Sequence, residues 1–199
     1  MVTFTVNTDI ITNKKPTPTL PKGGRANTKA KQALQQEAPP PLQKSWEGLF
    51  TLRIPTKKEF KQISFFITEF ELDNRDLKKE QFIVALRDNE LVGFGRLRDH
   101  TDCLELCSLG VVTSYRRQGI GKAIVAKLIE NFSKKIYLVC IIPDFFIPFG
   151  FHKVENFPIS IQNKIEYCTS ELIVPETYVA MLLQKRMFFI DNVSIKKSC

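Results

Sequence analysis

The spacing of apolar residues changes repeatedly between residues 46 and 183, and each change predicts a new element. An apolar residue at every second position indicates a strand, whereas recurrence after three or four positions indicates a helix. By this measure, helices are expected at 56–70, at 120–129 and, as a short bent turn, at 144–151. The strands that the pattern predicts are 48–55, 80–87, 90–99, 103–112, 134–142, 152–157 and 176–184.

Local signals define several boundaries. Thr56 followed by Glu59 is a capping box, which predicts the start of the first helix. Asp88 and Asn89 are hairpin turn residues, so the strands on either side of them should pair antiparallel. Pro148 should keep the third helix short. Strict alternation along 103–112 predicts one strand face with Glu105, Cys107, Leu109 and Val111, and the opposite face with Leu104, Leu106, Ser108 and Gly110.

The order of the elements predicts the fold class. Strands that alternate with helices indicate an α/β fold. The strand at 134–142 is almost wholly apolar, which is typical of a strand covered on both faces. A hydrophobic fraction of 43% in 199 residues supports one ordinary core. We therefore expect a single α/β domain, with a mixed central sheet of about six or seven strands and helices on both faces.

The net charge of +8 is concentrated at the two ends of the sequence. Residues 1–45 carry +5 and include a Pro- and Lys-rich stretch with few large apolar residues, which is typical of a disordered leader. Residues 184–199 carry +3, whereas 46–183 holds eighteen residues of each sign. The predicted organisation is a basic leader at 1–45, a neutral folded domain at 46–183 and a basic tail at 184–199.

The two ends leave alternatives open. Nucleic-acid binding through the leader would rest on charge alone, so nucleic acid is an unlikely partner. Within the tail, the apolar run Met187–Ile190 has three interpretations: packing on the domain, pairing with a second copy in a homodimer, or sequence with little structure.

Several classes of protein are not favoured. No apolar run reaches the length of a membrane span and no charged-then-apolar segment follows Met1, so we expect a cytoplasmic protein without a membrane partner. The five cysteines include no C-x-x-C pair and are expected to be buried thiols. His100 and His152 do not lie at ligand spacing from a cysteine pair, so no metal site is predicted.

The stretch Ser114–Ile129 carries the main functional motif. It places Arg116 before Gly119 and Gly121 and then continues as a helix. Glycines at a helix start let the backbone approach a bulky anion, and the N–H groups and arginines there attract its charge. A Walker loop needs four residues between its glycines and then Lys-Ser/Thr, and a dinucleotide fingerprint needs a third glycine, where Ile124 stands. The motif therefore predicts a pyrophosphate site of another kind.

This motif, within 105–129 and followed by 139–154, resembles the acetyl-CoA signature of the GNAT family of N-acetyltransferases, Arg/Gln-x-x-Gly-x-Gly/Ala after a strand that ends in Val. The resemblance covers about 48–183. It implies a GNAT-like domain with a splayed central strand pair, and transfer of the acetyl group of acetyl-CoA to a primary amine by direct attack. A finer similarity to the short, kinase-free relatives of N-acetylglutamate synthase implies the α-amine of glutamate or a related amino acid as acceptor.

The resemblance also implies where the cofactor lies. Backbone groups of Val111 and Val112 would meet the pantetheine arm, with the thioester near Cys140 and Ile141. Three phenylalanines, Phe145, Phe146 and Phe149, would wall the cofactor side. The cofactor-binding residues predicted in this way are Val111, Val112, Arg116, Arg117, Gln118, Gly119, Ile120, Gly121 and Lys122.

The acceptor side is predicted from three residues. Glu105, six residues before Val111, stands where many members of the family place a carboxylate beside the acceptor amine, so it is the predicted catalytic base or amine anchor. Arg98, near Arg96 and His100, is predicted to bind an acidic acceptor together with Glu105. The alternatives are a surface carboxylate and solvated charges at a strand end.

The proton donor is open at this point. Phe146 occupies the position where many members of the family have a tyrosine acid. The thiolate would then take its proton from water, from the amine itself, or from another group such as Tyr167 or Tyr178. The missing tyrosine also leaves a second function open, an acyl-CoA-binding sensor without turnover.

Overall fold

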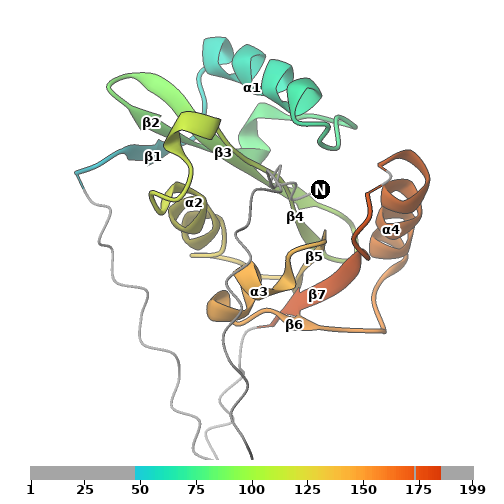
Figure 1. The fold of residues 1–199 in the computed structure, drawn as a ribbon. Helices are drawn as coiled ribbons and strands as arrows, with labels where there is room; N and C mark the ends of the chain where they lie inside the picture. The colour runs from blue at the N-terminus through green and yellow to red at the C-terminus, as the bar shows by residue number, and fades with distance from the viewer. Residues whose placement is uncertain (1–47, 173, 185–199) are drawn as a thin grey trace, which may run out of the picture.

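The computed structural model describes residues 48–172 and 174–184 (Figure 1). The predicted leader at 1–45 and the predicted tail beyond Gln184, including Met187–Ile190, lie outside these ranges. Among the described helices, none combines the length and the apolar character that a membrane span requires.

A seven-stranded mixed sheet runs through the described residues in the order β1-β2-β3-β4-β5-β7-β6, which confirms the predicted α/β class. β4 and β5 are parallel neighbours, and the other neighbouring pairs are antiparallel. The strands are Thr51–Arg53 (β1), Phe82–Arg87 (β2), Glu90–Asp99 (β3), Leu104–Val111 (β4), Ile136–Cys140 (β5), His152–Lys153 (β6) and Val179–Leu183 (β7). The α-helices are Lys57–Glu69 (α1), Ile120–Leu128 (α2), Pro143–Phe146 (α3) and Ile159–Glu171 (α4).

The predicted start and turn signals are present. The Thr56 N–H donates to Glu59 Oε2 at 2.7 Å, and the Glu59 N–H donates to Thr56 Oγ1 at 3.3 Å, which completes the capping box of α1. Asp88 and Asn89 have φ values of 50° and 65°, as a tight hairpin between β2 and β3 requires.

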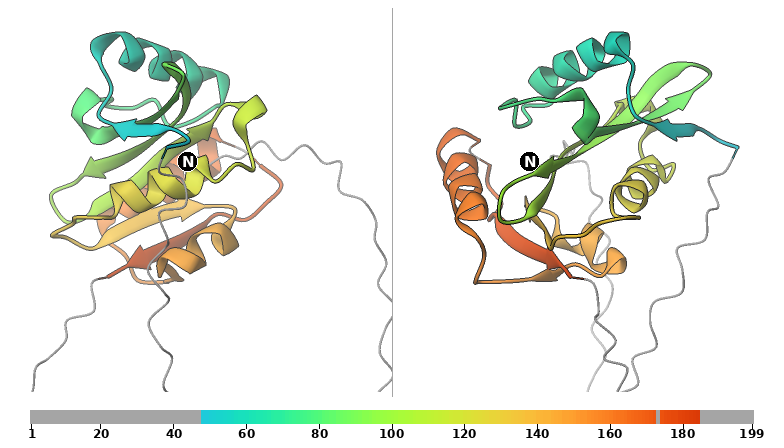
Figure 2. Two further views of the ribbon diagram at one scale, coloured as in Figure 1. Left: turned by 90° about the vertical axis from the view of Figure 1, so that its left-hand side faces the viewer. Right: turned by 180° about the vertical axis from the view of Figure 1, so that it is seen from behind.

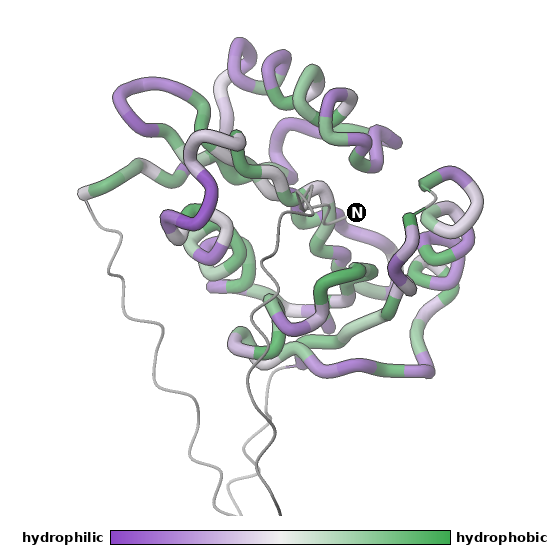
Figure 3. Tube along the Cα trace, in the orientation of Figure 1, coloured by the Kyte–Doolittle hydropathy of each residue, from purple (hydrophilic) through white to green (hydrophobic). Residues whose placement is uncertain are grey.

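The helices cover both faces of the sheet (Figures 1 and 2). On one face, α2 and α3 pack over the main core, which includes Leu106, Ile124 and Leu138. On the other face, α1 packs on β2 and β3, and α4 packs on β5 and β7. Purple and green alternate along α1 because apolar residues such as Ile63 and Ile67 recur on its buried side (Figure 3). α1 and α4 therefore flank the part of the sheet that contains β4.

Two glycines of β3 allow α2 to pack closely on the sheet. A Cβ atom on Gly95 would lie 2.6 Å from Ile124 Cγ2 and 3.0 Å from Leu128 Cδ1. A Cβ atom on Gly93 would lie 3.0 Å from Ile120 Cγ2. Because Ile120 begins the helix that follows the glycine motif, this close packing fixes the position of the motif relative to β4.

We expect Gly95→Ala to lower the free energy of unfolding by about 1–3 kcal/mol, the usual cost of overpacking a core. The methyl group would collide with the branched side chain of Ile124, and α2 would have to shift. Urea unfolding checks this prediction, with Lys61→Ala on the exposed side of α1 as the control, for which a change within about 0.5 kcal/mol is expected. Equal stability of the two variants would contradict it.

The strict alternation predicted for β4 is wrong beyond Cys107. The β3–β4 register shifts between Phe94 and Arg96, and Ser108 has a φ of 47°. This one-residue bulge turns the strand, because two residues of β4 then oppose one of β3. As a result, Leu109 and Val111 lie with Leu106 in the α2-side core, while Ser108 donates to the Asp73 carbonyl oxygen on the α1 side at 3.2 Å.

α4 was not expected from the sequence. Its buried residues are Ile161, Lys164 and Cys168, whereas Ile159 is largely exposed. A lysine on the inward stripe and an isoleucine on the outward side conceal the helical period. Pro158, at the N-cap, makes no side-chain cap, so the usual start signal is missing as well.

Candidate active site

The central strands β4 and β5 splay apart, which confirms that expectation. They are paired only at Leu104–Ile136 and Glu105–Tyr137. Beyond these two pairs, β4 continues to Val111 and β5 to Cys140 without pairing with each other. Glu105 therefore lies at the point where the two strands begin to separate.

The glycine motif follows the open end of β4. Gly119 is the N-cap of α2, has a φ of 82° and makes no side-chain cap hydrogen bond. A Cβ atom built on Gly119 would have no neighbour within 4 Å, so the space beside it is open. The first N–H groups of a helix have no partner within the helix, and the first-turn N–H groups of α2 start beside this open space. The geometry fits a phosphate-bearing ligand, as the motif predicts.

The side chains around Gly119 divide into two groups. Arg117, with a φ of 63°, and Lys122 are exposed and supply cationic charge beside the loop. The side chain of Gln118 is used within the protein, since its Oε1 accepts from Arg87 NH1 at 3.0 Å and its Nε2 donates to the Ser114 carbonyl oxygen. The Ile120 side chain and Gly121 are buried, so only main-chain groups of these two residues suit the predicted role.

The strand end before the motif makes main-chain hydrogen bonds within the protein. The N–H of Val112 donates to the Val92 carbonyl oxygen at 3.0 Å, and the Val112 carbonyl accepts from the Tyr115 N–H at 2.9 Å. The Val112 carbonyl oxygen has a second lone pair, so the predicted contact of Val112 with a pantetheine arm stays a prediction. The carbonyl oxygen of the preceding residue, Val111, accepts a hydrogen bond from Arg116 Nε at 3.1 Å. This bond braces the strand end, while the predicted cofactor contacts of Val111 and Arg116 stay predictions.

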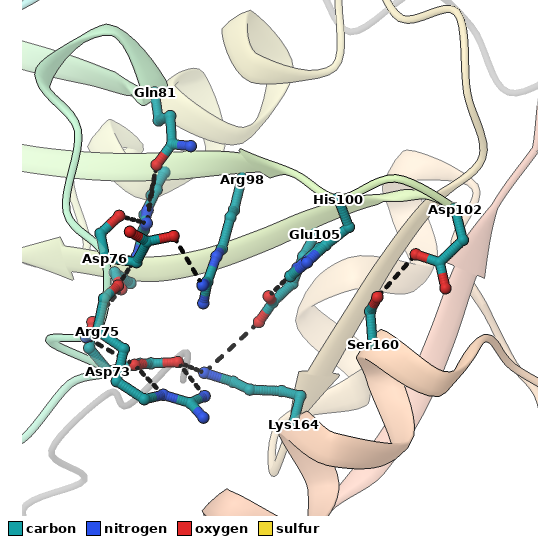
Figure 4. A network of polar contacts seen from close by, with 12 residues as sticks. Asp73, Arg75, Asp76, Gln81, Arg98, His100, Asp102, Glu105, Ser160 and Lys164 are labelled. Carbon is teal, nitrogen blue, oxygen red and sulfur yellow. Dashed lines mark hydrogen bonds and ion pairs between the residues drawn. The ribbon is translucent and has the colours of Figure 1, made fainter.

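A cluster of charged side chains fills the α1–α4 side of β4 (Figure 4). Glu105 is at its centre and is 1% exposed. Its Oε2 accepts a hydrogen bond from His100 Nε2 at 2.8 Å, and its Oε1 lies 3.5 Å from Lys164 Nζ. Among the described residues, Oε1 accepts no hydrogen bond. The cluster, called the polar cluster below, consists of Asp73, Arg75, Asp76, Arg96, Arg98, His100, Glu105 and Lys164.

Glu105 is held in its ionised form. Burial acts to raise its pKa, but the hydrogen bond from His100 and the charge of Lys164 outweigh burial and lower the pKa to about 2. A carboxylate with so low a pKa takes up a proton poorly at neutral pH. Of the two predicted roles for Glu105, the pKa favours the amine anchor over the base.

Lys164 links α4 to the loop after α1. Its Nζ lies 2.5 Å from Asp73 Oδ2, and burial of the lysine is nearly complete. Burial acts to lower the pKa of Lys164, but the charges of Glu105 and Asp73 keep it above its usual range, so the group is an ammonium. Asp73 also accepts from Arg75 Nε at 2.8 Å and from Arg75 NH2 at 2.6 Å. Arg75 in turn stacks on Tyr167 of α4, with its Cζ 3.6 Å from the ring centroid.

The two arginines of β3 differ in their surroundings. Arg96 is fully buried, and it donates to Gln81 Oε1 and to the carbonyl oxygens of Arg75 and Asp76, which makes it a structural residue. Arg98 lies directly opposite Glu105 in the β3–β4 register. Its NH2 donates to Asp76 Oδ2 at 3.2 Å, and no other described residue accepts from its guanidinium. Most donors of Arg98 are therefore available beside Glu105.

The three positions that the sequence raised for a tyrosine acid, Phe146, Tyr167 and Tyr178, are all engaged within the protein. Phe146 has no exposed surface and packs edge-on against Phe151 in the main core, so a hydroxyl at this position would be directed into apolar surroundings. The Tyr178 hydroxyl donates to the Leu172 carbonyl oxygen at 2.7 Å, and burial raises the pKa of Tyr178 to about 12. Tyr167 supports Arg75 through its ring.

Buried thiols do not add a second reactive group. Cys103, Cys107, Cys140 and Cys168 are buried and form no disulfide with one another, as the sequence predicts, while Cys199 lies outside the described residues. Burial raises the pKa of Cys140 to about 11, and its Sγ contacts Met181 Sδ at 3.8 Å. Within the described ranges, no group of three or more His, Cys, Asp or Glu residues is arranged to hold a metal ion.

Sequence reasoning gave His100 no separate role and missed four members of the polar cluster, which are Asp73, Arg75, Asp76 and Lys164. Asp73 and Arg75 lie in the loop between α1 and β2, and Lys164 lies on the unexpected helix. The one signal that could have revealed these residues is Lys164, a lysine on the inward face of a helix. This signal can be recognised only once the helix itself is known. The turn between β3 and β4 brings His100 within hydrogen-bonding distance of Glu105, and the sequence alone does not show this contact.

Comparisons with known proteins agree with this geometry. The profile of the acetyltransferase (GNAT) family matches residues 46–145, half of the chain. No curated protein sequence matches the chain. Among solved structures, N-acetylglutamate synthase from Neisseria gonorrhoeae, complexed with coenzyme A and L-arginine, is similar at a TM-score of 0.55 and 15% identity. The match covers 69% of this chain but only 34% of that synthase, so this chain spans about a third of its length.

Two other solved structures are matched over nearly their whole length. Rv2747 from Mycobacterium tuberculosis, in complex with CoA, matches at a TM-score of 0.54 and 17% identity, over 68% of this chain and 99% of that one. Ard1 from Thermoplasma volcanium matches at a TM-score of 0.51 and 15% identity, over 68% and 97%. At these identities the similarity concerns the fold.

Proposed function

The chain belongs to the acetyltransferase (GNAT) family, and we propose that it transfers the acetyl group of acetyl-CoA to the α-amine of an amino acid by direct attack. One observation carries the choice of acceptor. Arg98 and Glu105 are direct cross-strand neighbours, the former with unused donors and the latter with an oxygen that accepts no hydrogen bond from the described residues. An α-amino acid has an amine and a carboxylate at a spacing that suits such a pair.

The acetyl-CoA end of the reaction is assigned to the motif after β4. Gly119, Ile120 and Gly121 would offer main-chain N–H groups to the diphosphate, with Arg117 and Lys122 as nearby cations. The thioester supplies the activated acetyl carbon. The splay between β4 and β5 supports this placement, because an arm that enters from the motif meets Glu105 where the strands converge.

The acceptor end is assigned to the polar cluster. The cluster contains four cations and three carboxylates, so its net charge is +1 with His100 neutral. A bound carboxylate would neutralise this excess, which favours an acceptor with an acid group. An α-amino acid with a neutral amine meets this requirement through its α-carboxylate, and glutamate is the acceptor that the family resemblance implies.

The proton balance follows from the same groups. The neutral amine attacks the acetyl carbon, a C–N bond forms and the C–S bond breaks. The nitrogen loses one proton, and the thiolate gains one to leave as free CoA. Because Phe146 and Tyr178 are unsuited to donate, we assign the transfer to the proton released by the amine, carried through water.

A thiol-release screen tests the proposed function. Protein and acetyl-CoA are mixed with α-amino acids, the decarboxylated analogue of each, polyamines and peptide N-termini, and free CoA thiol is measured. We expect release with an α-amino acid and much less with its decarboxylated analogue. Binding of acetyl-CoA without thiol release from any amine would instead identify the sensor alternative.

We expect Arg98→Met to raise KM for the amino acid about 10- to 100-fold with little change in kcat, the usual effect of losing hydrogen bonds to a charged partner. The same variant should leave KM for the decarboxylated analogue unchanged. Arg53→Met, on the edge strand β1 and paired with Glu59 of α1, is the control and should leave both values unchanged. Equal losses with the two acceptors would contradict the role of Arg98 as a carboxylate site.

A further inference from the structure

Lys164 places a buried positive charge beside the proposed amine site. Its Nζ is 3.5 Å from Glu105 Oε1, the oxygen left for the acceptor, and 2.5 Å from Asp73 Oδ2. Lys164 therefore forms its hydrogen bond with Asp73 and lies near Glu105 without a hydrogen bond to it. Figure 4 shows the Lys164 side chain directed toward Glu105. An acceptor nitrogen that bonds to Oε1 would therefore lie close to the ammonium.

The charges around this point decide which form of the acceptor fits. Asp73 has two cationic partners, Arg75 and Lys164, so this trio has a net charge of +1. Glu105 supplies the opposing −1. A neutral amine would leave this buried balance intact, whereas an ammonium would add a positive charge in surroundings where unpaired charges are costly.

Direct attack on a thioester needs the neutral amine, because an ammonium has no lone pair. From these contacts we infer that Lys164 is a positioning residue that selects the neutral form of the acceptor amine at Glu105. This role rests on the proposed function. It gives α4, which joins β6 to β7, a part in the reaction beyond covering the sheet.

Other groups near Lys164 do not cancel its charge at Oε1. On β4, Cys107 is a buried thiol whose pKa burial raises to about 11, so it is uncharged at neutral pH. On α4 itself, the Tyr167 ring centroid lies 5.6 Å from Nζ. The titratable or charged groups that face Lys164 from the elements around it are Asp73 and Arg75 (loop after α1), Arg98 (β3), His100 (β3–β4 turn), Glu105 and Cys107 (β4), and Tyr167 and Cys168 (α4).

The pH dependence of kcat tests the inference, because it reports groups of the complex with both substrates bound. Without the neighbouring positive charge, the bound ammonium loses its proton less readily. In Lys164→Met, the acid limb of the kcat profile should therefore move to higher pH, by about one to three units for charges about 4–6 Å apart. The probe is the most active amino acid of the thiol-release screen.

Two further variants keep the test independent of folding. Lys164→Gln can still donate to Asp73 and should show the same direction of shift. Lys164→Arg retains the charge and should leave the acid limb within about 0.3 units of the unmodified protein, a tolerance well below the shift expected from a unit charge. Asp73 keeps its bonds from Arg75 in all three, which supports folding. Thermal unfolding and CoA binding check that each variant is intact.

The outcomes separate the two proposals. Turnover by Lys164→Met and Lys164→Gln with an unmoved acid limb overturns the role of Lys164 and leaves the proposed function standing. No thiol release from the unmodified protein with any amine overturns the proposed function itself, and the role of Lys164 with it. Acetylation of Lys164, in which an acetyl group replaces one hydrogen of the amine and which mass spectrometry of its peptide would detect, would also overturn the inference, because the lysine would then be an acceptor and not a fixed charge.

Discussion

Replacement of Glu105 by glutamine is expected to lower kcat/KM for the amino acid about 100- to 1,000-fold. Glutamine keeps the size of the side chain but removes the negative charge that balances Lys164 and that we propose as the anchor of the amine. It also leaves His100 without its charged partner. Steady-state thiol release with varied amino acid measures the loss.

The Glu105→Gln substitution should impair turnover of the amino acid but not the binding of CoA. Calorimetry with CoA should give the same Kd for Glu105→Gln and for the unmodified protein, because the glycine motif lies at the other end of β4. Glu59→Gln is a matched control, since Glu59 is also a carboxylate with a pKa lowered to about 2, chiefly by its bonds with Arg53, but it lies on α1. That variant should keep its turnover. A Glu105→Gln protein with unchanged kcat/KM would show that Glu105 is only structural.

Gly119→Val is expected to weaken CoA binding about 100-fold or more. A β-branched residue is strained at a φ of 82°, and its side chain would fill the open space beside the first turn of α2. Both effects act against the approach of a diphosphate to the main-chain N–H groups. Titration calorimetry with CoA measures the change in Kd.

Gly48→Val separates strain from binding. Gly48 has a φ of 95° and no neighbour within 4 Å of a built Cβ atom, so the substitution introduces the same backbone strain in equally open space. It precedes β1 and lies outside the motif. We expect a similar loss of unfolding free energy from both variants, about 1–3 kcal/mol, but a normal Kd from Gly48→Val. Weakened binding in both would assign the effect to general destabilisation.

The sequence by itself determined most of the local structure and the cofactor end of the site. Local interactions within a few residues are enough to fix three features: the helix cap at Thr56, the hairpin turn at Asp88, and the loop with glycines at 119 and 121. Their geometry therefore follows from the neighbouring sequence. The α/β class followed for the same reason, because periodicity is a property of each segment alone. The splay of β4 and β5 was implied by resemblance and not by any local signal.

The acceptor end was decided by the tertiary structure. Ser108 turns β4 by a bulge that depends on its partner strand, and Lys164 lies on a helix whose inward stripe contains a charge. Asp73 and Lys164 are ninety-one positions apart, and their contact exists only because α1 and α4 flank the same strand. A buried ion pair needs both partners in place before either tolerates burial, so no single segment of sequence reveals it.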